Sequence, residues 1–174
     1  MKQLRSLWGA FVILAVGIFA LSVPMTAKAQ VESVPDLAKD WNVRIGVFVF
    51  NQNAAADKAG RIGISGLVER TVFHGDKYDV NVGIGYNGFD TVYSVPVTGS
   101  IIFHPGNLRF GVGAGYSFNK RVGGSGSNGT VISLIAGYEF VHGKNPLSID
   151  ARYNFIGGSS NELDGLGITL GIKL

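Results

Sequence analysis

Histidines recur at three similar turns, and their spacing raises the question of a shared chemical site. The segments VFHGDKYDV, IFHPGNLRF and FVHGKNPLSI place His74, His104 and His142 after an apolar run and before a turn that contains glycine or proline. Three imidazoles on one rim could bind a metal ion such as zinc. However, Asp76 is the one carboxylate within these turns, and adjacent turns would hold their histidines too far apart. The sequence favours a repeated hairpin turn, with no metal and no other cofactor.

Two glycine-rich runs raise the separate question of a phosphate-binding loop. GVGAG (111–115) and GGSGSNG (123–129) are followed neither by a helical pattern nor by Gly-Lys-Ser/Thr, so the motif for such a loop is incomplete. The chain has no cysteine, which excludes disulfides and thiol chemistry.

The elements that must position these residues are β-strands, because side chains alternate between apolar and polar with almost no helical period. A tilted strand needs about 9–11 residues to cross a bilayer, whereas strands of soluble proteins most often have about 5–6. The alternating segments of this chain have the longer length. We predict eight strands at 41–50, 62–73, 78–87, 92–103, 108–118, 131–141, 147–156 and 165–174.

The alternation defines an apolar face in which Arg70 is the one charged residue. An eight-stranded barrel has little interior, so small and polar side chains fit inside and the many large apolar ones do not. The apolar face must therefore point outward, into lipid. Arg70 lies three residues from a turn, from where its side chain can reach the membrane surface. The alternative is a soluble barrel or sandwich with the faces exchanged, binding a small hydrophobic molecule.

Aromatic residues and loop lengths agree with the lipid-facing arrangement. All six tyrosines belong to the outward set, and most lie near strand ends, as in the aromatic girdles of membrane barrels. The turns at 74–77, 104–107 and 142–146 are short, as expected on the periplasmic side. The other connections, at 51–61, 88–91, 119–130 and 157–164, are mostly longer and rich in Gly, Ser and Asn, which is typical of outer loops.

The opposite face predicts a charged interior in which four acids balance four bases. Inside a narrow barrel an unpaired charge would be costly, whereas paired charges are tolerated. We interpret the set as a plug that closes the barrel and fixes strand register, with a gated ion path as the alternative. The eight residues are Arg44, Glu69, Asp79, Arg109, Glu139, Asp150, Arg152 and Lys173.

The outer half of the interior carries small residues, with Phe48, Phe50 and Ile135 as the large exceptions. This pattern is compatible with a cavity open to the outside, but we favour a lumen that the two phenylalanines fill. A catalytic site there would need a nucleophile, a base and an orienting group within hydrogen-bond reach. Ser94 and Ser117 lie near the outer end, but the histidines are predicted at the opposite rim.

The first residues have the pattern of a leader. An uncharged run at 7–23 follows Lys2 and Arg5, and Ala-Lys-Ala at 27–29 has the form of a signal-peptidase site. An uncleaved membrane anchor is the alternative. We predict a signal peptide at 1–29, a periplasmic segment at 30–40 and the barrel at 41–174. Loss of the leader's three basic residues leaves 12 basic and 12 acidic residues, so the basic surface that nucleic-acid binding needs is absent.

The segments FHPGNLRFGVGAGYSF and GLGITLGIKL resemble the small outer-membrane β-barrels of Gram-negative bacteria, the group of the OmpA membrane domain and OmpX-like proteins. The resemblance covers roughly 41–174. It implies an all-β, eight-stranded antiparallel up-and-down transmembrane barrel, placed in the cell outer membrane by the barrel assembly machinery. The family usually ends in an aromatic residue, whereas this chain ends in Lys173-Leu174.

The expected function is therefore that of a monomeric outer-membrane barrel with a closed polar interior, acting structurally or through its outer loops. Expected partners are outer-membrane lipids and lipopolysaccharide, for which Lys120 and Arg121 are the best contact candidates because they are basic and lie in an outer loop. The alternatives are an enzyme that modifies lipid A and a binder of a small hydrophobic ligand in the outer lumen.

Overall fold

The protein is described here from a computed structural model. The structure describes residues 40–51, 61–89, 91–121, 123, 126–142 and 145–174. The predicted signal peptide at 1–29 lies outside these residues, as does all of the predicted periplasmic segment except Asp40.

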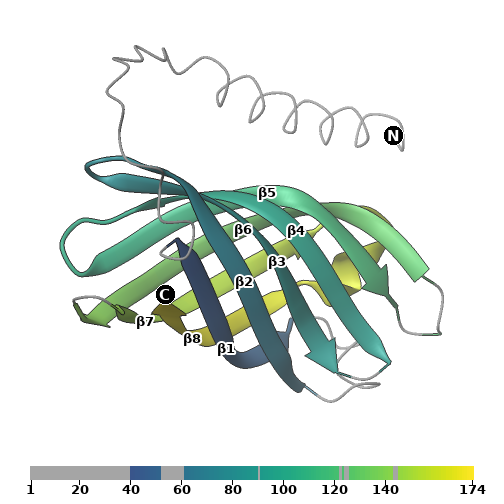
Figure 1. The fold of residues 1–174 in the computed structure, drawn as a ribbon. Coiled ribbons are helices and arrows are strands. Elements are labelled where there is room, and N and C mark those ends of the chain that lie inside the picture. The colour runs from purple at the N-terminus through teal and green to yellow at the C-terminus, as the bar shows by residue number, and fades with distance from the viewer. Residues whose placement is uncertain (1–39, 52–60, 90, 122, 124–125, 143–144) are drawn as a thin grey trace, which may run out of the picture. The chain divides into compact units, whose positions relative to one another are not determined.

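Eight antiparallel strands form a closed barrel in which each strand pairs with the next and β8 pairs with β1 (Figure 1). The predicted fold class is confirmed. Every connection joins neighbouring strands, so the topology is up-and-down. The strands are β1 (Trp41–Phe50), β2 (Ile62–His74), β3 (Tyr78–Phe89), β4 (Val92–Phe103), β5 (Leu108–Lys120), β6 (Gly126–Val141), β7 (Leu147–Ile156) and β8 (Gly165–Lys173).

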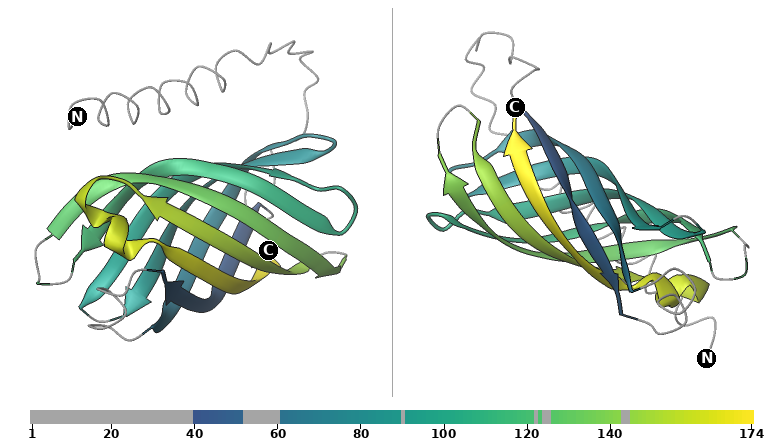
Figure 2. Two further views of the ribbon diagram at one scale, coloured as in Figure 1. Left: turned by 180° about the vertical axis from the view of Figure 1, so that it is seen from behind. Right: turned by 90° about the horizontal axis from the view of Figure 1, so that it is seen from below.

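A short 3-10 helix, η1 (Gly158–Leu163), lies between β7 and β8 at the barrel end opposite to the C-terminal residue (Figure 2). We call the end that carries η1 the loop end. The other end, which carries the three histidine turns, is called the turn end. Among the described residues, no helix is long and apolar enough to cross a membrane.

The hairpin of β5 and β6 is longer than the sequence predicts. β6 begins at Gly126 rather than at 131, and Asn119 pairs with Ser127 while Lys120 pairs with Gly126. Glycine, serine and asparagine have low strand propensity, so the pattern predicts a loop there. The ladder consists of backbone hydrogen bonds, which continue regardless of these side chains. The connection that was predicted at 119–130 is therefore reduced to 121–125.

Side chains alternate between the two faces as predicted. Outward residues such as Ile45, Ile84 and Leu170 are 68, 53 and 58% exposed, although all are apolar. The inward residues are mostly buried and polar, and each of the eight strands contributes at least one buried serine, threonine or asparagine. The protein therefore presents an apolar outer wall around a polar interior, which is the reverse of a soluble barrel.

Candidate functional site

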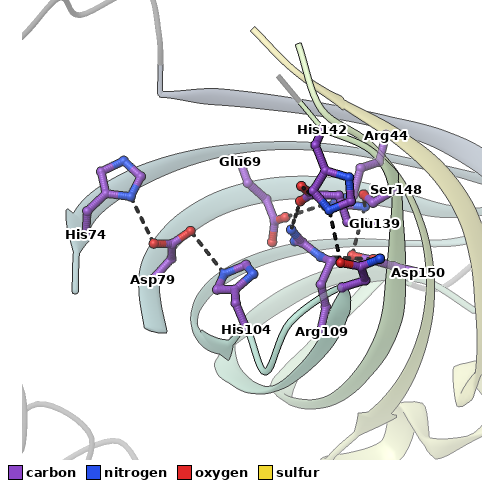
Figure 3. A network of polar contacts seen from close by, with 11 residues as sticks. Arg44, Glu69, His74, Asp79, His104, Arg109, Glu139, His142, Ser148 and Asp150 are labelled. Carbon is purple, nitrogen blue, oxygen red and sulfur yellow. Dashed lines mark hydrogen bonds and ion pairs between the residues drawn. The ribbon is translucent and has the colours of Figure 1, made fainter. Parts of the chain in front are cut away.

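The interior near the turn end contains one connected group of charged side chains. Arg152 donates from Nη2 to Glu69 Oε1 at 2.6 Å, and Arg44 Nε lies 3.4 Å from the second oxygen of Glu69. Arg44 Nη1 also lies 2.8 Å from Asp150 Oδ2. Asp150 Oδ1 lies 3.2 Å from Nε of Arg109. The group thus joins β1, β2, β5 and β7 across the lumen (Figure 3).

We call this group the ionic plug: Arg44, Glu69, Arg109, Glu139, Asp150 and Arg152. Glu139 is its outermost member, at 3.9 Å from Arg109 Nη1 and with a side chain that is 23% exposed. The side chains of Glu69 and Asp150 are each only 1% exposed. Three guanidinium groups and three carboxylates balance, so burial leaves no net charge in a low-dielectric interior.

Glycines make room for the ionic plug. Gly171 pairs with Arg44, Gly137 pairs with Asp150 and Gly83 pairs with Glu69. A Cβ on Gly83 would come within 2.7 Å of Glu69 Cγ, and one on Gly171 would come within 2.5 Å of Arg44 Nη1. Each long side chain therefore lies across a neighbouring strand at a position where only glycine fits. The sequence signal for this arrangement is a glycine with inward parity on the strand beside a long charged residue.

Two of the eight predicted interior charges lie outside the ionic plug. Asp79 contacts histidines at the turn end. Lys173 is partly buried and, among the residues that the structure describes, forms no ion pair within 4.0 Å. Each is the inward-facing residue of its strand that lies nearest the turn end, where the interior opens to solvent.

The turn end carries a second polar cluster, centred on Asp79. His74 Nδ1 lies 2.9 Å from Asp79 Oδ1, and His104 Nε2 lies 3.1 Å from Asp79 Oδ2 (Figure 3). His74 Nε2 lies 3.0 Å from Asp40 Oδ1. Two carboxylates can only accept, so both contacts of His74 are hydrogen bonds only when both ring nitrogens carry a proton. The cluster connects the segment before β1, the β2–β3 turn and the β4–β5 turn.

The histidine partner is Asp79 and not Asp76, the carboxylate that the turn sequences suggested. Asp79 stands opposite His74 in the β2–β3 register, and that pairing was readable from the hairpin. His142 instead contacts the next turn, with Nε2 at 3.1 Å from Asn107 Oδ1. The turn histidines thus connect neighbouring turns. The described residues contain no group of three or more histidine, cysteine or acidic side chains that could hold a metal ion.

The Asp79 cluster yields a stability prediction. Asp79→Asn is expected to lower the free energy of unfolding by about 1–2 kcal/mol, because it removes the charge that accepts from two imidazoles. Asp76→Asn in the same turn is the matched control, since Asp76 is exposed, and its effect should stay within about 0.5 kcal/mol. Urea unfolding followed by far-UV circular dichroism measures both. Equal effects of the two substitutions would contradict the role of Asp79.

The loop end of the interior is closed by apolar side chains rather than open. Phe48 is fully buried, and its ring packs edge-on against Phe50 with centroids 5.2 Å apart. The preference for a lumen filled by these two phenylalanines is confirmed, and Ile135 is buried as well. We call this group the apolar plug: Phe48, Phe50, Val92, Val131, Ile156 and Leu163.

η1 contributes Leu163 to the apolar plug, and polar contacts hold the helix and the residue that follows it. Arg121, which follows β5, contacts Glu162 with Nε at 3.0 Å and Nη2 at 3.4 Å. The backbone N–H of Ile156 donates to Asp164 Oδ1 at 2.6 Å. Burial raises the pKa of the Asp164 carboxyl, and that hydrogen bond acts in the opposite direction. Arg121 is therefore engaged in holding η1, while Lys120 has outward parity at the end of β5.

A small cavity between the two plugs has room for about one water molecule. This cavity of about 20 Å³ lies in the middle of the lumen. Around it, side chains of neighbouring strands are hydrogen-bonded: Ser65 donates to Asn87 Oδ1 and Ser133 donates to Asn154 Oδ1, each at 2.7 Å. The cavity is lined by Ser65, Gly66, Leu67, Gly85, Asn87, Pro96, Thr98, Ser133, Arg152, Asn154, Gly167 and Thr169.

The hydroxyls considered for catalysis are buried near the loop end. Ser94 is 1% exposed, and Ser117 donates to Asn119 Oδ1 at 2.6 Å. All three histidines lie at the turn end, with the ionic plug in between. No serine–histidine pair of the kind that acyl transfer requires is therefore formed by these residues.

Comparisons with known proteins found similarity in fold but none in sequence families. No family model matches it, and no curated protein matches its sequence. The crystal structure of Neisserial surface protein A is similar with a TM-score of 0.53 and 14% identity, covering 77% of this chain and 96% of that one. A structure from the de novo design of transmembrane β-barrels is similar with a TM-score of 0.51 and 16% identity, covering 78% and 96%. The fold expected from the sequence resemblance is thereby confirmed.

Proposed function

We propose that this protein is a monomeric outer-membrane barrel of a Gram-negative bacterium, which acts through the surface it presents at the loop end and does not conduct solutes. The observation that carries the proposal is a lumen closed at two levels. The ionic plug joins opposite walls near the turn end, and the apolar plug fills the loop end. The space between them holds about one water.

The outer wall supports the membrane location. Its apolar residues form a continuous exposed surface, which in water would be an aggregation hazard and in lipid is the expected contact face. Aromatic side chains gather at both ends of the wall. Phe73 and Tyr78 stack at the turn end with centroids 5.7 Å apart, and Tyr86 and Tyr93 stack at the loop end with centroids 5.5 Å apart. Such rims match the two interfaces of a bilayer.

The orientation of the two ends follows from the lengths of the connections, and it supports contact with lipopolysaccharide. Short turns face the periplasm in barrels of this type, and longer connections face outward. Lys120 then lies at the outer surface, where anionic lipopolysaccharide is the expected partner. Arg121 shapes this surface by holding η1 through Glu162. Insertion by the barrel assembly machinery belongs to the same proposal.

Reconstitution tests both parts of the proposal. The purified protein should need detergent and should migrate differently on a gel before and after heating. In planar bilayers it should give no conductance steps, whereas a porin prepared in parallel gives them. Steps that change in size in an Asp150→Asn variant would identify the ionic plug as a gated ion path and would overturn the closed-lumen proposal. Solubility without detergent would overturn the membrane location.

Lipid analysis separates the proposal from its enzymatic alternative. Phe48 and Leu163 fill the part of the lumen in which an acyl chain of lipid A or a small hydrophobic ligand would have to bind. Mass spectrometry of lipid A from cells with and without the gene should therefore give the same acyl pattern. A reproducible difference in acylation would favour the enzyme.

A further inference from the structure

Arg70 is a charge on the lipid-facing wall that forms no ion pair with any acid among the residues that the structure describes. It has outward parity in β2, where it pairs with Trp41 of β1 and Val82 of β3. Every acid within the eight strands has inward parity: Glu69, Asp79, Glu139 and Asp150. Apart from Lys120 at the loop end of β5, no other lysine or arginine of the strands faces outward. No acid of the eight strands therefore shares the outer wall with Arg70.

The guanidinium group of Arg70 lies over the indole ring of Trp41. Its Cζ lies 5.8 Å from the centroid of the Trp41 ring, within the range of a cation–π contact. Its Nε is buried and has no hydrogen-bond partner among the described residues, so the terminal Nη groups are the donors that an outside ligand would contact. A guanidinium carries five N–H donors in a planar fork that matches a phosphate, so an arginine against hydrocarbon has strong unmet donor capacity.

The depth of Arg70 selects the ligand. Trp41 is the first residue of β1 and stands beside Arg70, which places both at the turn end of the wall. Tryptophan prefers the membrane interface, where lipid phosphates lie. An arginine near the interface is tolerated far better than one at the bilayer midplane.

We propose that Arg70 and Trp41 form a binding site for the phosphate group of a phospholipid in the leaflet at the turn end. The guanidinium fork binds the phosphate, and the indole face fixes the direction of the fork. The site rests on the proposed membrane location. The site gives the outer wall one specific contact with a lipid headgroup in the leaflet at the turn end, whereas the rest of the wall is apolar.

Native mass spectrometry of the full chain, released from a mild uncharged detergent, tests the proposal. The protein is titrated with phosphatidylethanolamine, with diacylglycerol of the same acyl chains, and with inorganic phosphate. The phospholipid should bind more tightly than diacylglycerol. Arg70→Gln should raise the phospholipid concentration for half occupancy about fivefold, the effect of one basic residue near a membrane surface. Arg70→Lys, which keeps the charge without the fork, should lie between.

Lys77→Gln is the matched control, because Lys77 is an exposed basic residue of the turn end that should not touch the bound lipid. Equal lipid binding by Arg70→Gln and the unchanged protein would overturn the site. So would equal binding of diacylglycerol, or Arg70-dependent binding of inorganic phosphate without a preference for the lipid. Heat-modifiable migration of each variant verifies the barrel. Its loss in the unchanged protein would instead contradict the proposed function.

Discussion

Asp150→Asn is expected to lower the free energy of unfolding by about 3–5 kcal/mol. Asp150 is 1% exposed and contacts two guanidinium groups, Arg44 at 2.8 Å and Arg109 at 3.2 Å. The asparagine keeps the size of the side chain and removes its charge. Two arginines then share a closed interior with one carboxylate fewer, and a buried charge without a partner is among the most costly defects of a fold.

Glu139→Gln is the matched control for this experiment. It removes the same charge from the same ionic plug, but Glu139 is 23% exposed and lies 3.9 Å from Arg109, so water can replace it. The expected loss is below about 1 kcal/mol. Far-UV circular dichroism during urea unfolding in lipid vesicles measures both variants. Similar losses for the two would mean that burial of the ionic plug does not govern its contribution to stability.

A double variant sharpens the result for Asp150. Arg109→Met combined with Asp150→Asn removes one charge of each sign and restores the balance among all members of the ionic plug, with Arg44 and Arg152 against Glu69 and Glu139. Part of the stability lost in the single variant should return, because the uncompensated positive charge is gone. Additive losses would show that local packing, and not charge balance, causes the effect of Asp150→Asn.

Ile84→Arg is expected to lower the free energy of unfolding by about 2–4 kcal/mol in a bilayer. Ile84 is 53% exposed on the outer wall and lies between Val68 and Val97 of the neighbouring strands. An arginine on a water-exposed strand would be tolerated. At the midplane of a bilayer the same group loses its hydration and has no anion within reach.

The same substitution at Ile62 controls for residue type and exposure. Ile62 is the first residue of β2, is 66% exposed and lies at the loop end of the wall. Arginine there reaches the interface, so the expected loss is about 0–1 kcal/mol. Unfolding in lipid vesicles compares the two variants directly. If both are neutral, or if both lose the same stability, the outer wall does not cross a membrane.

The alternation of side chains was enough to predict the eight strands and their two faces. This is a local property, because successive residues of a strand point to opposite sides whatever the partner strand is. The small interior volume then determined which face points inward, since a narrow barrel admits polar and small side chains but not the many large apolar ones. The positions of β1, β4 and β7 follow directly from this pattern, whereas the polar extension of β6 does not, because backbone pairing alone sustains it.

Only the closed tertiary structure decided which interior groups meet. Arg152 contacts Glu69 from 83 residues away along the chain, and Arg44 contacts Asp150 across the lumen. The alternation along each strand places all of these residues inside the barrel. Their positions along the barrel axis, however, depend on the register of every strand pair around the barrel. The same registers bring His74 and His104 to Asp79 and gather Leu163 and Phe48 into the apolar plug. Such contacts depend on the registers of all eight strand pairs taken together, and no local pattern of residues specifies that combination.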